Sequence, residues 1–517
     1  MFYFYAFVSI LLVGRLYWKR RTSVCIKEEK HDLPTINPQN FITMKKNIPL
    51  IILTIACIVV GIFLTVTTHK EEKITRCIAV HTPERPTDQQ DIIGLSCPPI
   101  DTVRIGFIGL GSRGSEAVRR FTHQKGIEVK ALCDLHQAKV DSCQQMLLRA
   151  KLPKAAEYHG SEDAWKQVCE QPDIDLIYIA TDWLSHTPMM VYAMEHGKHV
   201  ACEVPAAMNL EEIWKVIDTA ERTHKHCMML ENCVYDFFEI TTLNMAQQGL
   251  FGEITHVKGA YNHCLQEYWG DYDANWRMQY NIGNKGDVYP THGMGPACQL
   301  LDIHRGDRMK YLVAMDSDPV SLPTYLKSHG NTEETPKLQN GEVTLTLIRT
   351  EKGKTIQIEH NVASPRPYSR LYQLTGTKGF ANKYPIEGYA LNSKELPQNI
   401  TQEQVFTAHE YMPECTKRQL MDQYKDPIVK AMEEEAKKVG GHGGMDFIMD
   451  ARLIYCLRHG LPLDMDVYDL AEWCSLIPLT KLSIENGSVP VEVPDFTRGG
   501  WNRTQGYRHA FAETQKD

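Results

Sequence analysis

Short apolar runs alternate with helical patterns in the first half of the chain. Four of these runs are typical of buried strands: Thr102–Ile108, Glu128–Cys133, Asp175–Ala180 and Lys198–Cys202. Helical patterns over Gly114–Thr122 and Thr187–His196 lie between them. Strands that alternate with helices build βαβ units and a parallel sheet. We therefore predict a doubly wound α/β domain over residues 101–230.

The pattern changes after about residue 235. Strand-like runs at Ile254–Tyr261, Glu342–Arg349 and Thr355–His360 follow one another, with helical stretches interspersed. Such an order is typical of an α+β domain. We expect residues 231–497 to form this domain, with an open, mainly antiparallel sheet.

Two apolar stretches precede these domains. Residues 48–66 carry no charge and are long enough to cross a bilayer, and Lys45 and Lys46 come just before them. We expect residues 44–68 to be a signal peptide or a membrane anchor, with Met44 as an alternative start. The positive-inside rule then places the rest outside the cytoplasm, either periplasmic or at the cell surface. Residues 1–43, which contain the apolar stretch Met1–Val13, are either a second apolar segment or upstream sequence that is not part of the protein.

Two further segments lack a periodic apolar pattern. Residues 69–100 contain four prolines, and we interpret them as a linker. Residues 498–517 are polar and are predicted to be a surface tail.

Charge and cysteine usage exclude some classes of function. The 517 residues have a formal net charge of −8, which disfavours a nucleic-acid partner because phosphate binding calls for a basic face. The 15 cysteines are scattered, with no C-x-x-C motif and no paired Cys/His cluster. We therefore expect neither a metal site nor a disulfide framework.

A glycine motif directly follows the first predicted strand. Gly109, Gly111 and Gly114 form G-x-G-x-x-G at the start of a helix, a pattern that cradles a pyrophosphate on the helix N-terminus. Asp134 ends the second strand, 20 residues after Gly114. An acidic side chain there binds a ribose 2′-hydroxyl and repels a 2′-phosphate. The domain is thus predicted to be a Rossmann domain that binds NAD rather than NADP, with Arg113 as a further contact.

Several longer segments carry a family resemblance. Ala201-Cys202-Glu203-Val204-Pro205 resembles the Glu-Lys-Pro motif of the Gfo/Idh/MocA oxidoreductases, with Val204 in place of the lysine. The other matching segments are Cys202–Ala207, Glu231–Asp236, Tyr289–Gly293, Ser364–Arg370 and Gly440–Asp446. Residues 101–500 resemble glycoside hydrolase family 109, the NAD-dependent α-N-acetylgalactosaminidases, which are built on the Gfo/Idh/MocA scaffold.

The resemblance implies two sets of site residues. The implied cofactor shell is Ser112, Arg113, Asp134, Trp183, Leu184, Ser185, His186, Glu203, Val204 and Asn232. The implied sugar site is Tyr261, Arg277, Tyr289, Pro290, Thr291, His292 and Tyr368. His442 lies in a glycine-rich loop and is a further candidate for substrate contact. The implied partner is a glycan or glycoconjugate with a terminal α-GalNAc, and a homo-oligomer is expected because the open sheet of this scaffold commonly forms an interface.

The resemblance also implies a reaction cycle. NAD⁺ takes hydride from C3 of the sugar, the ketone acidifies the C2 proton, the aglycone leaves from C1, water adds, and the hydride returns. His292 is a candidate proton carrier because imidazole titrates near neutrality. Tyr368 is the second candidate, and it would need a cation nearby because the pKa of a phenol is ordinarily near 10. The possible cations are Arg277, Arg366 and Arg370, and the division of labour between His292 and Tyr368 stays open.

Two departures favour a hydrolase over a net dehydrogenase. Val204 replaces the lysine, and Val288 stands four residues before His292, where dehydrogenases usually place an aspartate; Asp287 is one residue off. A net sugar oxidoreductase remains the alternative function. A membrane-tethered sugar- or nucleotide-binding protein is a second alternative.

Overall fold

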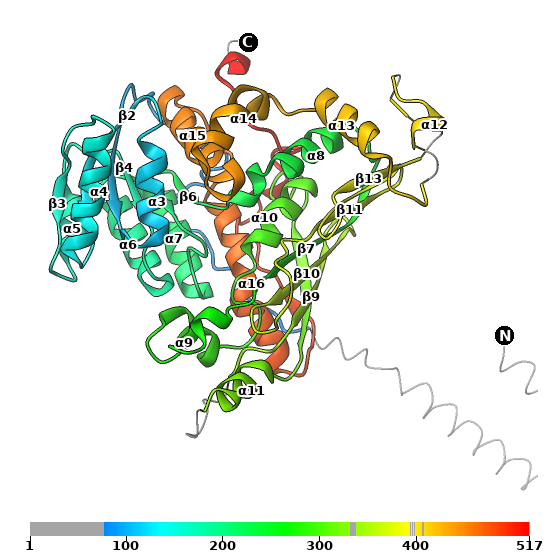
Figure 1. Cartoon of the computed structure of the whole chain (residues 1–517), viewed down its shortest axis with the longest axis horizontal. Helices are drawn as coiled ribbons and strands as arrows, with labels where there is room; N and C mark the ends of the chain where they lie inside the picture. The colour runs from blue at the N-terminus through cyan, green and yellow to red at the C-terminus, as the bar shows by residue number, and fades with distance from the viewer. Residues whose placement is uncertain are drawn as a thin grey trace, which may run out of the picture. The chain divides into compact units, whose positions relative to one another are not determined.

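The computed structural model describes residues 77–515, apart from 331–337, 393, 395, 398, 406 and 407. The apolar stretches within residues 1–68, and with them the expected signal or anchor, lie outside the described residues. Among the described residues, no helix combines the length and apolar character needed to cross a membrane. The described residues belong to one compact unit, whose layers are drawn in Figure 1.

Six parallel strands form the first sheet, in the order β3-β2-β1-β4-β5-β6. Their bounds are Val103–Ile108 (β1), Ile127–Cys133 (β2), Ala156–Tyr158 (β3), Leu176–Ile179 (β4), His199–Cys202 (β5) and Cys227–Met229 (β6). The connecting helices are α3 (Ser112–Phe121), α4 (Gln137–Arg149), α5 (Ala164–Glu170), α6 (Trp183–Glu195) and α7 (Leu210–Thr223). β4 and β5 are buried along their whole length, as expected of strands with helices on both faces. The predicted doubly wound parallel sheet is confirmed.

Eight strands form the second sheet, in the order β13-β12-β11-β7-β10-β9-β8-β14. Their bounds are Ile254–Asn262 (β7), Met309–Asp316 (β8), Thr344–Thr350 (β9), Thr355–Asn361 (β10), Tyr372–Gly376 (β11), Gly379–Lys383 (β12), Gly388–Leu391 (β13) and Val491–Glu492 (β14). β10 pairs with β7 in parallel, and the other pairings are antiparallel. The predicted α+β part with a mainly antiparallel sheet is therefore confirmed.

Helices fill the space between the two sheets and cover the ends of the second one. Their bounds are α8 (Phe237–Gln247), α9 (Trp276–Gly283), α10 (Thr291–Leu300), α11 (Ser321–Ser328), α12 (Gln402–Val405), α13 (Glu414–Gln423), α14 (Pro427–Val439), α15 (Met445–His459) and α16 (Val467–Glu485). α10 packs on β7, and α16 contacts α7 and β6 on one side and β8 on the other. In Figure 1, α10 and α16 lie between the two sheets, so both domains share this layer.

The described part of the predicted linker is packed against the protein. Ile78 pairs with Val491 of β14, Ile92 is buried, and Arg85 forms an ion pair of 2.9 Å with the buried Glu221 of α7. Proline and the lack of periodicity indicate that a segment has no helix or strand, but they do not show whether it is packed. Residues 77–100 therefore pack against the folded unit, and their role as a linker stays a prediction.

The predicted C-terminal tail is also anchored. Arg498 contacts Glu221 at 3.2 Å and Asp218 at 2.6 Å. Tyr507 is 2% exposed and donates a hydrogen bond of 2.9 Å to the carbonyl of Asp464. The polar residues of this segment therefore form specific ion pairs and hydrogen bonds with the folded unit instead of pointing into solvent.

Candidate functional site

A cleft of about 1360 Å³ lies where the carboxyl ends of the first sheet's strands face the second domain. Open α/β sheets bind ligands at this edge. The predicted residues that line it are Gly109, Gly111, Ser112, Arg113, Asp134, Trp183, Ser185, His186, Glu203, Val204, Asn232, Tyr261, Arg277, Tyr289, His292, Tyr368 and His442. Cofactor and sugar candidates thus share one cleft.

Four predicted residues do not line the cleft: Gly114, Leu184, Pro290 and Thr291. Leu184 is 62% exposed, although its neighbours Trp183 and Ser185 face the cleft. Consecutive helical side chains point about 100° apart, so a whole run cannot face one space. Pro290 and Thr291 are buried at the start of α10, where they position His292.

The three motif glycines fit a dinucleotide. Gly109 has φ +86°, and a Cβ there would lie 2.6 Å from the carbonyl oxygen of Ala180. A Cβ on Gly111 would meet nothing within 4 Å, so a ligand can approach that backbone closely. A Cβ on Gly114 would lie 1.8 Å from the carbonyl oxygen of Gly109. Only glycine therefore allows the start of α3 to pack this close to the loop. These are the tight turn, the approach to pyrophosphate and the helix contact of a dinucleotide-binding loop.

Asp134 lies at the end of β2, where a ribose would be bound. Its carboxylate accepts hydrogen bonds from the backbone N–H of Leu110 (2.8 Å) and His136 (2.9 Å). These bonds fix the carboxylate beside the glycine loop, so a 2′-phosphate would meet a negative charge there.

Arg113 connects the cofactor loop to the second domain. Its guanidinium contacts Glu203 at 2.7 Å and Asp446 of α15 at 3.0 Å. Glu203 and Val204 follow β5 and line the cleft, and Val204 is 6% exposed. The position of the dehydrogenase lysine is therefore apolar and nearly closed to solvent.

The start of α6 is fixed by its own polar groups. Asp182 caps the helix and accepts hydrogen bonds from the N–H groups of Leu184 and Ser185. The ring nitrogens of His186 lie 2.8 Å from the carbonyl of Pro205 and 3.2 Å from that of Thr181. His186 thus holds the loop after β5, and burial lowers its pKa.

Several aromatic side chains surround Arg277 at the sugar end of the cleft. The guanidinium carbon of Arg277 lies 4.8 Å from the ring centre of Tyr289 and 5.4 Å from that of Trp183. Its Nη2 donates a hydrogen bond of 3.1 Å to Oη of Tyr261, which also lies 2.8 Å from Nδ1 of His263. Nε of Arg277 is buried and makes no hydrogen bond within the described part of the chain.

His292 lies in the first turn of α10 and is paired with a carboxylate. Its Nδ1 is 2.7 Å from Oε1 of Glu231, and both residues are buried. Burial lowers the pKa of His292 to about 4 although Glu231 opposes the shift. Burial alone would raise the pKa of Glu231, but His292 holds it below its usual range. A neutral imidazole therefore donates Nδ1–H to an ionised Glu231 and leaves Nε2 as an acceptor.

Tyr368 contacts Arg370, one of the three cations that the sequence analysis named as possible neighbours. Nε of Arg370 donates to the Tyr368 hydroxyl, whereas Arg366 pairs with Glu359 instead. Burial raises the pKa of Tyr368 above that of a free phenol, and the charge of Arg370 opposes this rise. Tyr368 is protonated at neutral pH, and Arg370 is placed to stabilise its anion.

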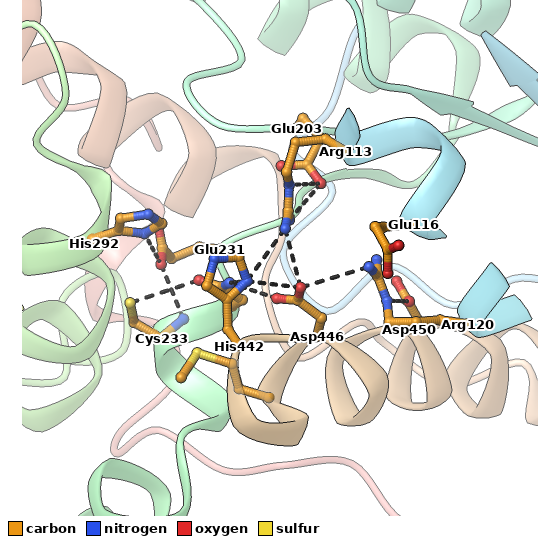
Figure 2. Close-up of polar contacts among 12 residues, drawn as sticks. Arg113, Glu116, Arg120, Glu203, Glu231, Cys233, His292, His442, Asp446 and Asp450 are labelled. Carbon is orange, nitrogen blue, oxygen red and sulfur yellow. Dashed lines mark hydrogen bonds and ion pairs between the residues drawn. The ribbon is translucent and has the colours of Figure 1, made fainter. Parts of the chain in front are cut away.

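His442 forms a second imidazole–carboxylate pair. Its Nδ1 lies 2.9 Å from Asp446, which also accepts a hydrogen bond of 2.5 Å from the amide of Asn232. Burial would raise the pKa of Asp446, but the hydrogen bond from His442 and the charges of Arg113 and Arg120 hold it well below its usual range. Figure 2 shows Asp446 in contact with His442 on one side, Arg120 on the other and Arg113 above.

Glu231, Cys233 and His292 place three potential metal-ligand atoms within 4.8 Å of one another. Arg370 lies 3.3 Å from the sulfur of Cys233, and burial raises the pKa of this thiol well above its usual value. A positive neighbour and a protonated thiol disfavour a divalent cation.

The site also contains Glu231, Arg370, Asp446 and His263, of which sequence reasoning named only Arg370, as one of three possible cations for Tyr368. The first three lie inside the matched segments, each one to four residues from a selected residue. Glu231 and Asp446 contact ligand-facing histidines rather than the cleft itself. Such partners can be found only from spatial proximity, which the sequence does not give.

The comparisons with known families cover both domains. Residues 103–231 match the family model described as "Oxidoreductase family, NAD-binding Rossmann fold", and residues 235–503 match "Glycosyl hydrolase 109, C-terminal domain". The Glycosyl hydrolase family 109 protein 1 of Bacteroides thetaiotaomicron is 63% identical over 437 residues, which cover 84% of this chain and 93% of that protein. A Glycosyl hydrolase family 109 protein of Porphyromonas gingivalis is 61% identical over 437 residues, with the same coverage of 84% and 93%.

Solved structures share the fold at low identity. The WlbA dehydrogenase from Bordetella pertussis in complex with NADH and UDP-GlcNAcA has a TM-score of 0.55 at 14% identity, covering 77% of this chain and 100% of that one. A levoglucosan dehydrogenase in complex with NADH has a TM-score of 0.54 at 15% identity, with coverage of 76% and 100%. The family matches and the relatives above 60% identity show that the chain belongs to glycosyl hydrolase family 109 and carries an NAD-binding Rossmann domain.

Proposed function

We propose that this chain is an α-N-acetylgalactosaminidase that cleaves a terminal α-GalNAc through NAD-dependent oxidation and elimination. The observation that carries the proposal is the shared cleft: the dinucleotide loop and the residues around His292 and Tyr368 line one continuous space. A sugar bound there would contact both the cofactor and the proton carriers. Membership in a glycoside hydrolase family supports hydrolysis rather than net oxidation.

NAD, when bound, supplies the acceptor for a hydride from C3 and returns it at the end of the cycle, so the sugar undergoes no net oxidation. The backbone at Gly109 and Gly111 would hold its pyrophosphate and Asp134 its ribose. Val204 carries no ionisable group, so the proton of the C3 hydroxyl must go to another side chain.

His292 takes the proton of the C3 hydroxyl. It is neutral at physiological pH, and its Nδ1–H is committed to Glu231. The remaining nitrogen, Nε2, can accept a proton, and the developing imidazolium is stabilised by the ionised Glu231. The buried carboxylate therefore compensates for the low basicity that burial imposes.

Tyr368 exchanges the proton at C2. Its hydroxyl proton leaves to solvent first, because only the phenolate can accept the C2 proton, and the guanidinium of Arg370 stabilises that anion. Arg277 positions the sugar, since its Nε has no protein partner among the described residues and can donate to a hydroxyl or acetamido oxygen.

The test is hydrolysis of p-nitrophenyl α-N-acetylgalactosaminide in D₂O, with deuterium at C2 of the released sugar measured by NMR. Release with deuterium at C2 is the expected result. Release without deuterium would contradict the elimination step. No release, with NADH accumulating on free sugars, would move the chain to the dehydrogenase alternative.

The variants Tyr368→Phe and His292→Gln should then lower both release and exchange. Tyr325→Phe is the matched control, because Tyr325 stacks on His329 and does not line the cleft.

A further inference from the structure

We propose that His442, held by Asp446, is the general acid that protonates the departing aglycone oxygen and then the base that activates water. This inference rests on the proposed function, because it names the proton donor for its elimination step. It assigns a catalytic role to His442, which the sequence analysis named only as a candidate for substrate contact.

The elimination step needs a proton donor that the first proton carrier cannot provide. When the C1–O bond breaks, the oxygen leaves with the electron pair and must gain a proton unless it belongs to a very acidic alcohol. At this stage His292 holds the proton taken from the C3 hydroxyl, and that proton must return to the same oxygen when the hydride comes back, so it is already assigned. Tyr368 is assigned to C2. The leaving oxygen therefore calls for another group in the same cleft.

His442 is placed for this task. Its side chain is 41% exposed and lines the cleft, and Nδ1 is bound to Asp446 at 2.9 Å. Nε2 makes no hydrogen bond within the described part of the chain, so it is the nitrogen that can carry a proton to or from a ligand. A carboxylate on the far nitrogen is the arrangement that fixes a catalytic imidazole in one tautomer.

Asp446 is itself held rigidly. Arg113 contacts it at 3.0 Å, Arg120 at 3.6 Å, and the amide of Asn232 at 2.5 Å. These groups keep the carboxylate ionised and in one orientation, as the lowered pKa of Asp446 indicates. His442 therefore sits on a fixed support although it lies in a loop of glycines.

Other cationic or imidazole groups of the cleft are differently committed. Both ring nitrogens of His186 face backbone carbonyls, and Lys383 pairs with Asp236 at 2.6 Å and Glu239 at 3.2 Å. Among the described residues that line the cleft, the histidines paired with a carboxylate are His292 and His442.

The proton transfers balance over one catalytic cycle. His442 starts the cycle as an imidazolium with Nδ1–H on Asp446, and it gives its Nε2 proton to the leaving oxygen as the C1–O bond breaks and the electron pair at C2 forms the C1–C2 double bond. Water then adds at C1 and returns one proton to Nε2 of His442, while C2 regains a proton from Tyr368. The imidazole ends as it began.

The test compares leaving groups of different acidity. In the His442→Gln variant, kcat/KM for p-nitrophenyl α-GalNAc should fall by no more than about 5-fold, because nitrophenolate leaves without a proton. For methyl α-GalNAc and GalNAc-α-threonine it should fall by about 100-fold or more, the usual effect of losing a general acid. His459→Gln, at the exposed end of α15, the helix that contains Asp446, is the matched control and should show neither effect.

A second readout separates catalysis from cofactor binding. C3 oxidation and C2 exchange precede departure of the aglycone, so unhydrolysed methyl α-GalNAc recovered from the His442→Gln variant in D₂O should still gain deuterium at C2. Equal losses for all glycosides, together with lost exchange, would instead assign His442 to cofactor binding and overturn the proposal. Wild-type rates in the variant would also overturn it. If the wild-type protein releases no aglycone at all, the proposed function itself fails, and this assignment fails with it.

Discussion

Glu231 and Asn232 are neighbours in the chain, yet they serve different histidines. Glu231 accepts the hydrogen bond of His292, and Asn232 donates to the carboxylate that holds His442. Both follow β6 directly and are buried. The geometry of two proton carriers therefore depends on one short segment at the edge of the first sheet.

Replacing Glu231 by Gln should lower kcat by about 100-fold or more, because the amide no longer stabilises the imidazolium of His292 and can bind the wrong tautomer. The measurement is kcat for p-nitrophenyl α-GalNAc, together with the thermal midpoint. KM should change little, since Glu231 does not line the cleft. A wild-type kcat in this variant would show that His292 does not carry the proton.

At the scale of elements, two glycines set the distance between β7 and α10. A Cβ on Gly259 of β7 would lie 2.6 Å from Cα of Gly293 in α10. This close approach brings the ring of Tyr261, on the strand, to 5.3 Å from that of His292, on the helix. The pair of glycines thus sets the width of the sugar end of the cleft.

The variant Gly259→Ala should destabilise the fold by about 1–3 kcal/mol and raise KM, because the helix must move away from the strand. Chemical unfolding and substrate kinetics measure the two effects. Gly283→Ala is the matched control, since a Cβ there would meet nothing within 4 Å. Equal stability of the two variants would mean that α10 can shift freely.

The elements of the parallel sheet were largely predictable because buried strands are continuous apolar runs. β3 and β6 were not predicted, since each has three residues and gives no periodic signal. The glycine loop and the resemblance led to 17 of the 39 residues that line the cleft. Leu184 does not line the cleft, because a matched run says nothing about which side of a helix each residue faces. The carboxylates of Glu231 and Asp446 could not be assigned from the sequence. Glu231 pairs with His292, which is 61 residues away, and Asp446 pairs with His442, which lies on a glycine loop whose path periodicity does not predict.

At the scale of the whole molecule, the buried carboxyl of Asp287 forms no ion pair within the described part of the chain. Asp287, the aspartate one residue away from the dehydrogenase position, is 1% exposed and accepts a hydrogen bond from the N–H of Tyr289. Burial raises its pKa to about 7. Since the unfolded carboxyl ionises near pH 4, the folded state binds the extra proton between these values, and this contribution to stability is lost as the pH rises from about 4 to 7.

The variant Asp287→Asn should therefore gain stability relative to the wild type as the pH rises from 4.5 to 7, and the difference should level off above pH 8. Thermal midpoints of both proteins across this range provide the measurement. An asparagine keeps the acceptor for Tyr289, so the comparison isolates the charge. A constant difference at every pH would show that Asp287 is not the titrating group.

The expected homo-oligomer and the extracytoplasmic location both stay predictions. Met315 of β8 and Leu345 and Leu347 of β9 are between 44% and 62% exposed on the second sheet. Met315 pairs directly with Leu345, so these side chains share one face. Light scattering would measure the size of the particle in solution.

The segments before the first sheet and after α16 both contact α7, which has a practical consequence for anyone who shortens this protein. Glu221 is fully buried and is neutralised by Arg85 from before the first sheet and by Arg498 from after the last helix. Cutting at residue 101 or at residue 497, where sequence patterns alone would place the ends of the domains, would leave a buried carboxylate short of a partner at a cost of several kcal/mol. The smallest fragment that keeps this fold must therefore extend beyond both apparent domain boundaries.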